Sequence, residues 1–136
     1  MLAIETNVLV RFLVRDDEVR FDKACRLIKR EVAAGRPIFI SLLVLLETEW
    51  VLRSRYRLSK KLMLAAFSGL LDADDVFLEN EPVVEEALFL WKVFLWKEAT
   101  ADFADCLIGA QHRRLGCRAT ASFDAKALKL PGFVAV

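Results

Sequence analysis

Short apolar runs recur along the chain, separated by longer segments in which apolar residues return every three or four positions. The runs at residues 2–5, 37–40 and 76–79 are short and predict buried strands. Weaker runs at residues 118–122 and 133–136 predict two more. No hairpin signal such as Asn-Gly joins any of these runs, so crossover connections and a mostly parallel sheet are expected.

Six helices are expected between the strands. They cover about residues 7–14, from the acidic positions 16–18 to 35, 41–56, 59–71, 82–98 and 100–116. Ser41, Ser59 and Thr100 precede three of these helices as caps, and Pro82 suits the first turn of another. The pattern predicts an α/β sandwich, and because no repeat or linker interrupts it, one domain is expected over residues 1–136.

Composition narrows the class of protein. The 136 residues are 56% hydrophobic and 29% charged, which is enough apolar material for one folded core. No stretch reaches the roughly 18 apolar residues that would cross a bilayer, and Glu5 interrupts the N-terminus before any export signal develops. Three cysteines without Cys-x-x-Cys spacing indicate buried thiols. A cytoplasmic protein without a membrane segment is expected.

The net charge of +1 conceals an uneven distribution. Residues 1–71 carry 13 basic and 8 acidic side chains, residues 72–98 carry 2 and 8, and residues 99–136 carry 5 and 3. This asymmetry predicts faces of opposite sign and is compatible with a polyanion bound on one side.

A few acidic residues stand among apolar neighbours. Glu47 shares a helical face with Leu43, Val44, Trp50 and Val51, so it is expected to point with the core face, whereas Glu49 is expected to be solvated. A buried carboxylate is costly unless it is paired. Glu47 is therefore a candidate for holding a cation, the alternative being an ion pair with a nearby arginine.

Four further residues make this interpretation stronger. Glu5 and Asp124 follow predicted strands, where ligand sites form in parallel sheets, and Asp102 and Asp105 lie one turn apart at the start of the sixth helix. Simpler roles are open for two of them, since Asp102 suits a helix N-terminus and Asp124 suits a turn. Asn7 either orients Glu5 or caps the first helix.

Such a group of acids has a recognisable chemistry. Carboxylates need a counterion when they lie close together, and an oxygen-only ligand set selects Mg²⁺ or Mn²⁺. A cation held in this way activates water and stabilises the charge that develops when a phosphodiester is cleaved. The pattern therefore predicts a nuclease.

The sequence resembles the PIN domain family, and more narrowly the VapC-like ribonuclease toxins. Glu5 to Asn7 stand where the family motif reads Asp-Thr-Asn, and residues 41–53 resemble the second motif with its glutamate at Glu47. Residues 101–110 resemble the third motif, with Asp105 as its central acid and Asp102 as an additional one. Residues 121–133 resemble the closing motif, with Asp124 as the fourth acid and Ser122 at its hydroxyl position.

The resemblance implies a PIN-like three-layer sandwich with a short, mostly parallel sheet flanked by helices. It also implies Mg²⁺ or Mn²⁺ bound by Glu5, Asp102 and Asp105, with Glu47 and Asp124 completing the catalytic acids. The expected activity is endonucleolytic cleavage of RNA. The expected partners are a second copy of the chain and a VapB-like antitoxin.

Glu5 departs from the family pattern, in which this acid is aspartate. The extra methylene moves the carboxylate by roughly 1.5 Å, a displacement that can lower a rate about a hundredfold. A degenerate PIN domain that binds RNA or a partner with little or no cleavage is therefore the alternative. A third interpretation is a structural subunit whose apolar surface meets partners.

The remaining candidates have simpler explanations. Trp50, Trp91 and Trp96 are expected in the core or in a subunit interface, and His112, the single histidine, on the surface or at a helix end.

Several cations lack an assigned role. Arg11 and Arg15 face either a substrate groove or water. A second group forms either a phosphate-tracking surface or a solvated loop, and consists of Arg53, Arg55, Arg57, Lys60 and Lys61.

Overall fold

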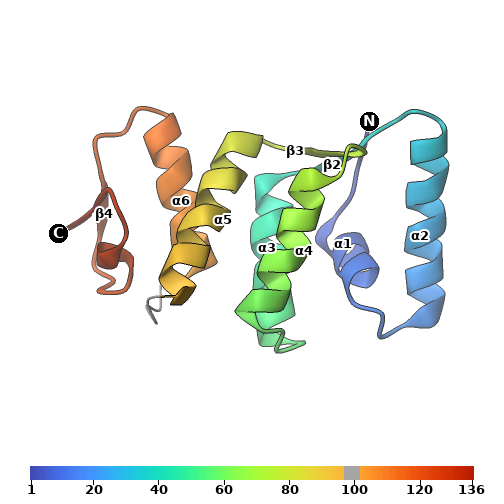
Figure 1. Ribbon diagram of the computed structural model, residues 1–136, viewed down its shortest axis with the longest axis horizontal. Helices are drawn as coiled ribbons and strands as arrows, with labels where there is room; N and C mark the ends of the chain where they lie inside the picture. Colours follow the sequence, from blue (N-terminus) through green and yellow to red (C-terminus); the bar gives the residue numbers. More distant parts are fainter. Residues whose placement is uncertain (97–101) are drawn as a thin grey trace. The chain divides into compact units, whose positions relative to one another are not determined.

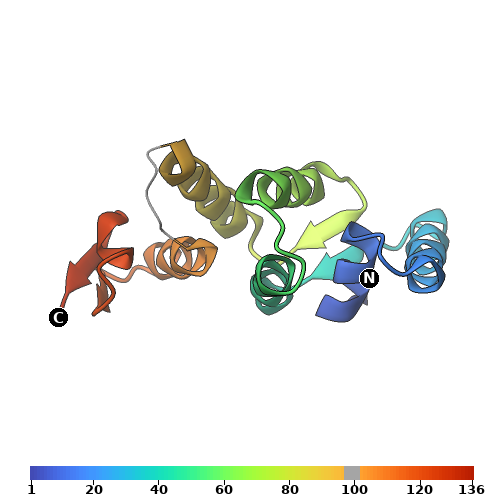
Figure 2. The same cartoon turned by 90° about the horizontal axis from the view of Figure 1, so that it is seen from below.

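The computed structural model describes residues 1–96 and 102–136, and divides them into two compact units, Met1–Glu79 and Asn80–Val136. Each unit is described by itself (Figures 1 and 2). The predicted α/β class is confirmed, because helices alternate with short strands and every strand pair is parallel.

The first unit is a three-stranded sheet with four helices, of which α1, α3 and α4 lie below the strands in Figure 1 and α2 stands at the side. Its elements are β1 (Leu2–Ala3), α1 (Thr6–Leu13), α2 (Glu18–Ala33), β2 (Ile38–Ile40), α3 (Leu42–Ser54), α4 (Lys60–Asp72) and β3 (Val76–Leu78). The strands run in the order β1-β2-β3, with Ile38 opposite both Leu2 and Val76. Strands adjacent in sequence are thus adjacent in the sheet, each joined to the next by two helices.

One face of this sheet carries the core. Ile38, Ile40 and Leu78 are buried, whereas Phe77, which points to the opposite face, is 53% exposed. Phe77 contacts the ring of Phe39 there, with ring centroids 6.1 Å apart. The alternation follows from the two-residue period of a strand, which sends successive side chains to opposite faces.

The predicted helix starts are confirmed where they rest on capping chemistry. Ser41 accepts a hydrogen bond from the backbone nitrogen of Val44 at 3.1 Å, and Ser59 accepts one from that of Leu62 at 3.3 Å. Asp17 caps α2 in the same way, which agrees with the expected acidic start of that helix. The predicted cap Thr100 lies outside the described residues.

The second unit pairs two helices and then two strands. Its elements are α5 (Glu81–Trp96), α6 (Phe103–Arg114), β4 (Thr120–Ser122), a one-turn 3-10 helix (Ala127–Lys129) and β5 (Phe133–Ala135). β4 and β5 are parallel, with Thr120 opposite Phe133. The predicted Gly116 stop is close to the observed end of α6, and Gly116 has a φ of 85°, a conformation that side chains other than glycine rarely adopt.

The core of the second unit forms between α5 and α6. Trp91 is buried, as predicted, with its ring centroid 5.0 Å from that of Phe103, and an ion pair of 2.9 Å joins Arg113 to Glu86. Gly109 allows α6 to approach β5, because a Cβ added there would lie 2.7 Å from the ring of Phe133. Trp96 belongs to α5, but its side chain is outside the described part.

Two features bear on the class of protein. No helix among the described residues is long and apolar enough to cross a membrane. Cys106 is buried as expected, and Cys25 is half-buried. The expectation of buried thiols is wrong for Cys117, which is exposed after the end of α6.

Candidate functional site

Three of the predicted site residues line one pocket in the first unit. Glu5, Asn7 and Glu47 border a cavity of about 280 Å³, here called the carboxylate pocket. Its remaining lining is Thr6, Val10, Arg11, Trp50, Val51, Arg55 and Tyr56. Glu5 is the N-cap of α1 and Glu47 lies on α3, and these two helices pack against each other. Residues 42 positions apart in the chain therefore meet at one surface.

The expected burial of Glu47 is wrong. Its side chain is exposed at the pocket rather than pointing into the core, although Trp50 and Val51 share its face as predicted. The core stripe of α3 consists instead of Leu45, Thr48 and Leu52. The helix is rotated so that a face with a carboxylate and an indole meets solvent.

Glu49 contradicts the prediction in the opposite direction. It was expected to be solvated, but it is only 3% exposed and forms an ion pair of 2.9 Å with Arg53, one turn along α3. This pair neutralises a carboxylate that would otherwise be buried alone. Arg53 is thereby engaged within its own helix, which leaves Arg55 as the cation of that segment that lines the carboxylate pocket.

Asn7 does not cap the first helix. The N-cap position belongs to Glu5, whose backbone is extended and whose side chain makes no capping hydrogen bond. Asn7 lies in the first turn of α1 and lines the pocket beside Glu5. The capping interpretation of Asn7 is therefore wrong. The place of Asn7 in the pocket is compatible with the second interpretation, in which Asn7 orients Glu5.

A fixed arginine lies at the edge of the same pocket. The guanidinium of Arg11 donates to both oxygens of Asp16, at 3.0 and 3.1 Å, and to the hydroxyl of Tyr56 at 3.3 Å. The hydrogen bond with Asp16 raises the pKa of Arg11 above its ordinary value. Burial raises the pKa of Tyr56, and hydrogen bonding with Asp16 raises it further. Both groups therefore keep their protons over the physiological pH range.

A second set of predicted acids lies in the second unit. Asp102 is the N-cap of α6, where its side chain makes no capping hydrogen bond, and Asp105 lies in the first turn of the same helix. Asp124 follows β4. Burial raises the pKa of Asp105 above its ordinary value, and the charges of Asp102 and Asp124 raise it further. Asp102 and Asp124 are thus near enough to Asp105 for their charges to act on it.

Ser122 positions the third of these acids. Its hydroxyl accepts a hydrogen bond of 3.0 Å from the backbone nitrogen of Asp124. The Oδ1 atom of Asp124 in turn accepts one of 2.9 Å from the backbone nitrogen of Lys126. The side chain thus makes the local turn that the simpler interpretation expects, and the turn also holds the carboxylate in one orientation.

The donor chemistry of these acids suits a hard divalent cation. All the candidate ligands are carboxylates. Burial and the charges of Asp102 and Asp124 disfavour the ionised form of Asp105, and a bound cation would offset both effects. Within residues 1–96 and 102–136, however, no three His, Cys, Asp or Glu side chains are gathered closely enough to hold a metal ion. The candidate carboxylates therefore fit a hard divalent cation by the chemistry of their oxygen donors.

Two pocket residues were missed in the sequence. Trp50 was expected in the core or at a subunit interface; 52% of it is exposed at the pocket, so the core interpretation is wrong. Its spacing of three from Glu47 is a signal that was available. Tyr56 had no such signal, because its contact with Arg11 spans 45 positions.

His112 lies in the last turn of α6 as predicted, 2.8 Å from the hydroxyl of Thr120.

The chain was compared with solved structures, curated proteins and models of protein families. A solved structure of Mycobacterium tuberculosis VapC20, described as a Sarcin-Ricin loop cleaving toxin, is 23% identical to the chain. That match has a TM-score of 0.42 and covers 98% of this chain and 97% of the other. No curated protein matches. The model of the PIN domain family matches residues 2–132, nearly the whole sequence and parts of both units. The chain belongs to the PIN domain family.

Proposed function

We propose that this protein is a metal-dependent RNA endonuclease of the VapC-like toxin type. The observation that carries the proposal is the placement of Asp105 in the first turn of α6, where burial and then the charges of Asp102 and Asp124 raise its pKa. Carboxyl groups whose pKa is raised by burial and by neighbouring charges cluster at functional sites. Membership of a family of nucleases supplies such a function, and the family match over residues 2–132 supports a single domain.

The residues have distinct roles in this proposal. Glu5, Asp102 and Asp105 are the ligands for Mg²⁺ or Mn²⁺, which would supply positive charge at the phosphodiester group. Glu47 and Asp124 accept hydrogen bonds from the attacking water and so orient it. Asn7 and Ser122 support Glu5 and Asp124, the latter through the hydrogen bond of 3.0 Å to the backbone of Asp124.

The cations of the carboxylate pocket have a complementary role. Arg11 and Arg55 line the pocket together with Glu5 and Glu47, so it carries both signs of charge. Guanidinium groups recognise phosphate oxygens through paired hydrogen bonds. We propose that they bind the phosphate of the substrate while the carboxylates face the bond that is cut.

Cleavage of a structured RNA in the presence of Mg²⁺ tests the proposal. Glu47→Gln should lower the rate by about a hundredfold or more, since it removes a charge at the reacting group and little volume. Asp22→Asn is the matched control, because Asp22 is an exposed acid on α2 away from the pocket. Equal cleavage by wild type and Glu47→Gln, or cleavage that persists in EDTA, would contradict these roles.

The alternative is a degenerate PIN domain that binds RNA or a partner with little cleavage. It is favoured by Glu5, which replaces the aspartate of the family motif and whose side chain forms no capping hydrogen bond. The two proposals differ in what an aspartate at this position would do.

The proposed partners are a second copy of the chain and a VapB-like antitoxin. An apolar groove of about 390 Å³ in the first unit is lined from α2 by Ile28 and Val32 and from α4 by Ala66 and Leu70. An apolar antitoxin segment would cover this groove. Co-purification with a small protein encoded beside this one is the observation that tests the pairing.

A further inference from the structure

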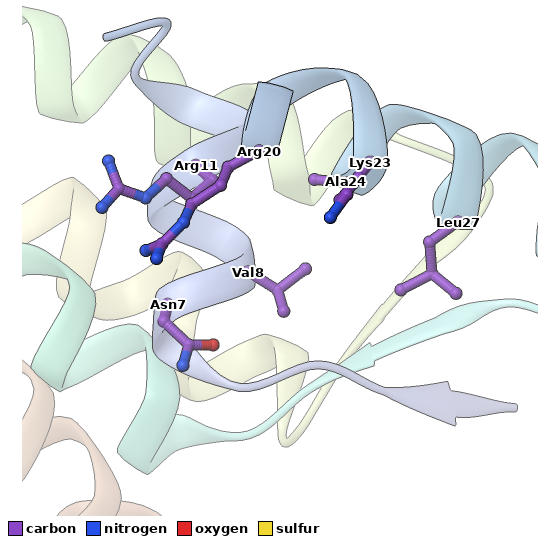
Figure 3. Close-up of a pocket in the computed structure, with 7 residues that line it drawn as sticks. All are labelled: Asn7, Val8, Arg11, Arg20, Lys23, Ala24 and Leu27. Carbon is purple, nitrogen blue, oxygen red and sulfur yellow. The ribbon is translucent and has the colours of Figure 1, made fainter. Parts of the chain in front are cut away.

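A second groove in the first unit lies between α1 and α2 and is strongly basic. It has a volume of about 400 Å³ and is called here the α1–α2 groove (Figure 3). The residues that line it are Asn7, Val8, Arg11, Arg20, Lys23, Ala24 and Leu27. Three of the seven are cations and none is acidic, so the groove is suited to an anion.

The cations of the groove are only partly neutralised. Arg11 is paired with Asp16 at 3.0 Å, whereas the contact of Arg20 with Asp17 is longer, at 3.6 Å, and largely exposed. Within the described part of the chain, Lys23 has no ion-pair partner. Exposed pairs of this kind are weak, and the donors that they leave free are available to a ligand.

The groove lies next to the carboxylate pocket. Asn7 and Arg11 line both cavities, and they lie one helical turn apart on the same face of α1. Figure 3 shows Arg11 and Arg20 extending toward one end of the groove, with Lys23 further along α2. A strand bound at the carboxylate pocket would therefore meet basic side chains of α2 on this side.

The chemistry of the groove favours a nucleic-acid backbone over a peptide. Arg20 and Lys23 present charged donors at its rim, whereas Val8, Ala24 and Leu27 supply an apolar wall and no hydrogen-bonding side chain. Repeated phosphates interact with separate cations in this way, and most protein hydrogen bonds to a nucleic acid go to its phosphates and sugars.

We propose that the α1–α2 groove binds backbone phosphates of RNA next to the phosphate held in the carboxylate pocket, with Arg20 and Lys23 as the binding residues. This inference rests on the proposed function, because it assigns a path to the same substrate. It extends that function by placing part of the substrate on α2, outside the acidic motifs.

The test measures RNA binding without cleavage. A short fluorescent single-stranded RNA is titrated in EDTA at several salt concentrations, with wild type and with the double variant Arg20→Gln/Lys23→Gln. The matched control is Arg26→Gln/Lys29→Gln, two exposed cations of the same helix that do not line the groove. All three proteins are compared by circular dichroism, so that a loss of fold is recognised.

The salt dependence of RNA affinity distinguishes direct contacts between the groove and phosphates from a general effect of charge. Each phosphate contact to single-stranded RNA contributes about 0.7 to the slope of log affinity against log salt. The groove variant should therefore lose about 1.4 from this slope, and the control variant should keep the slope of wild type. Cleavage with Mg²⁺ should fall at limiting RNA and recover at saturating RNA.

Other outcomes overturn the inference. An unchanged slope in the groove variant, or an equal loss in the control variant, means that the groove is not a phosphate path. Poly-glutamate serves as a second probe. If the groove variant loses poly-glutamate binding and keeps RNA binding, the groove belongs to an acidic peptide and the proposal is wrong. Absence of both RNA binding and cleavage in the wild type refutes the proposed function and the groove together, whereas cleavage by wild type with an unchanged slope refutes the groove alone.

Discussion

Glu5 occupies a position where an aspartate has two separate advantages. It is the N-cap of α1, with φ −87° and ψ 164°, the extended conformation that a capping residue adopts. Its backbone carbonyl accepts from the nitrogens of Val8 and Leu9, at 3.0 and 3.2 Å, but its side chain caps nothing. An aspartate has the shorter side chain that bonds the free backbone N–H groups, so Glu5→Asp should stabilise the protein by about 1 kcal/mol.

The same substitution should also change the activity. It returns the carboxylate to the distance of the family motif, a shift of roughly 1.5 Å, and should raise the cleavage rate by up to about a hundredfold. Glu5→Asn separates the two effects. Asparagine caps helices as well as aspartate does but carries no charge, so this variant should gain stability and lose cleavage.

The measurements are thermal unfolding by circular dichroism and single-turnover cleavage of RNA with Mg²⁺. A gain of about 1 kcal/mol corresponds to a rise in Tm of about 3 °C for a chain of this size. If both variants raise the Tm and neither raises the rate, the length of the Glu5 side chain does not limit catalysis, and the degenerate PIN domain is the better description. A fall in Tm for both would refute the capping argument.

Two further predictions concern the interior of the first unit. Thr48 is fully buried, and within the described residues its hydroxyl oxygen has no hydrogen-bond partner. Thr48→Val should therefore raise the free energy of unfolding, measured by urea denaturation, by about 1 kcal/mol. Thr48→Ser keeps the hydroxyl and should lower it. Glu31 is paired with Arg36 at 2.6 Å, and this hydrogen bond lowers the pKa of Glu31 below its ordinary 4.5. The stabilisation is therefore present above pH 4.5 and lost as the pH falls through the lowered pKa, so the Tm advantage of wild type over Glu31→Gln should disappear in acid.

Local signals were sufficient to predict most elements of the fold. Ser41, Ser59 and Asp17 start helices because each supplies an oxygen to a backbone N–H within three residues, an interaction that involves no distant part of the chain. The parallel strands followed from the absence of hairpin turns, which is also a local property. Both kinds of prediction depend on short-range chemistry.

The orientation of α3 could not be predicted in this way. Residues 42–46 are all apolar, so the hydrophobic pattern does not say which side of the helix is buried. The structure buries Leu45 and leaves Leu43 78% exposed. Glu47 and Glu49 consequently exchange the environments expected of them, because tertiary packing selects one face among several apolar ones.

The division of the chain has a consequence for biosynthesis. The first unit consists only of Met1–Glu79, so its carboxylate pocket and α1–α2 groove are complete once that segment has left the ribosome. At about 5–20 residues per second, the remainder is made in the next few seconds. If all five acids serve one reaction, a chain still being translated can bind an RNA backbone before Asp102, Asp105 and Asp124, the acids needed to cut it, have emerged from the ribosome and folded.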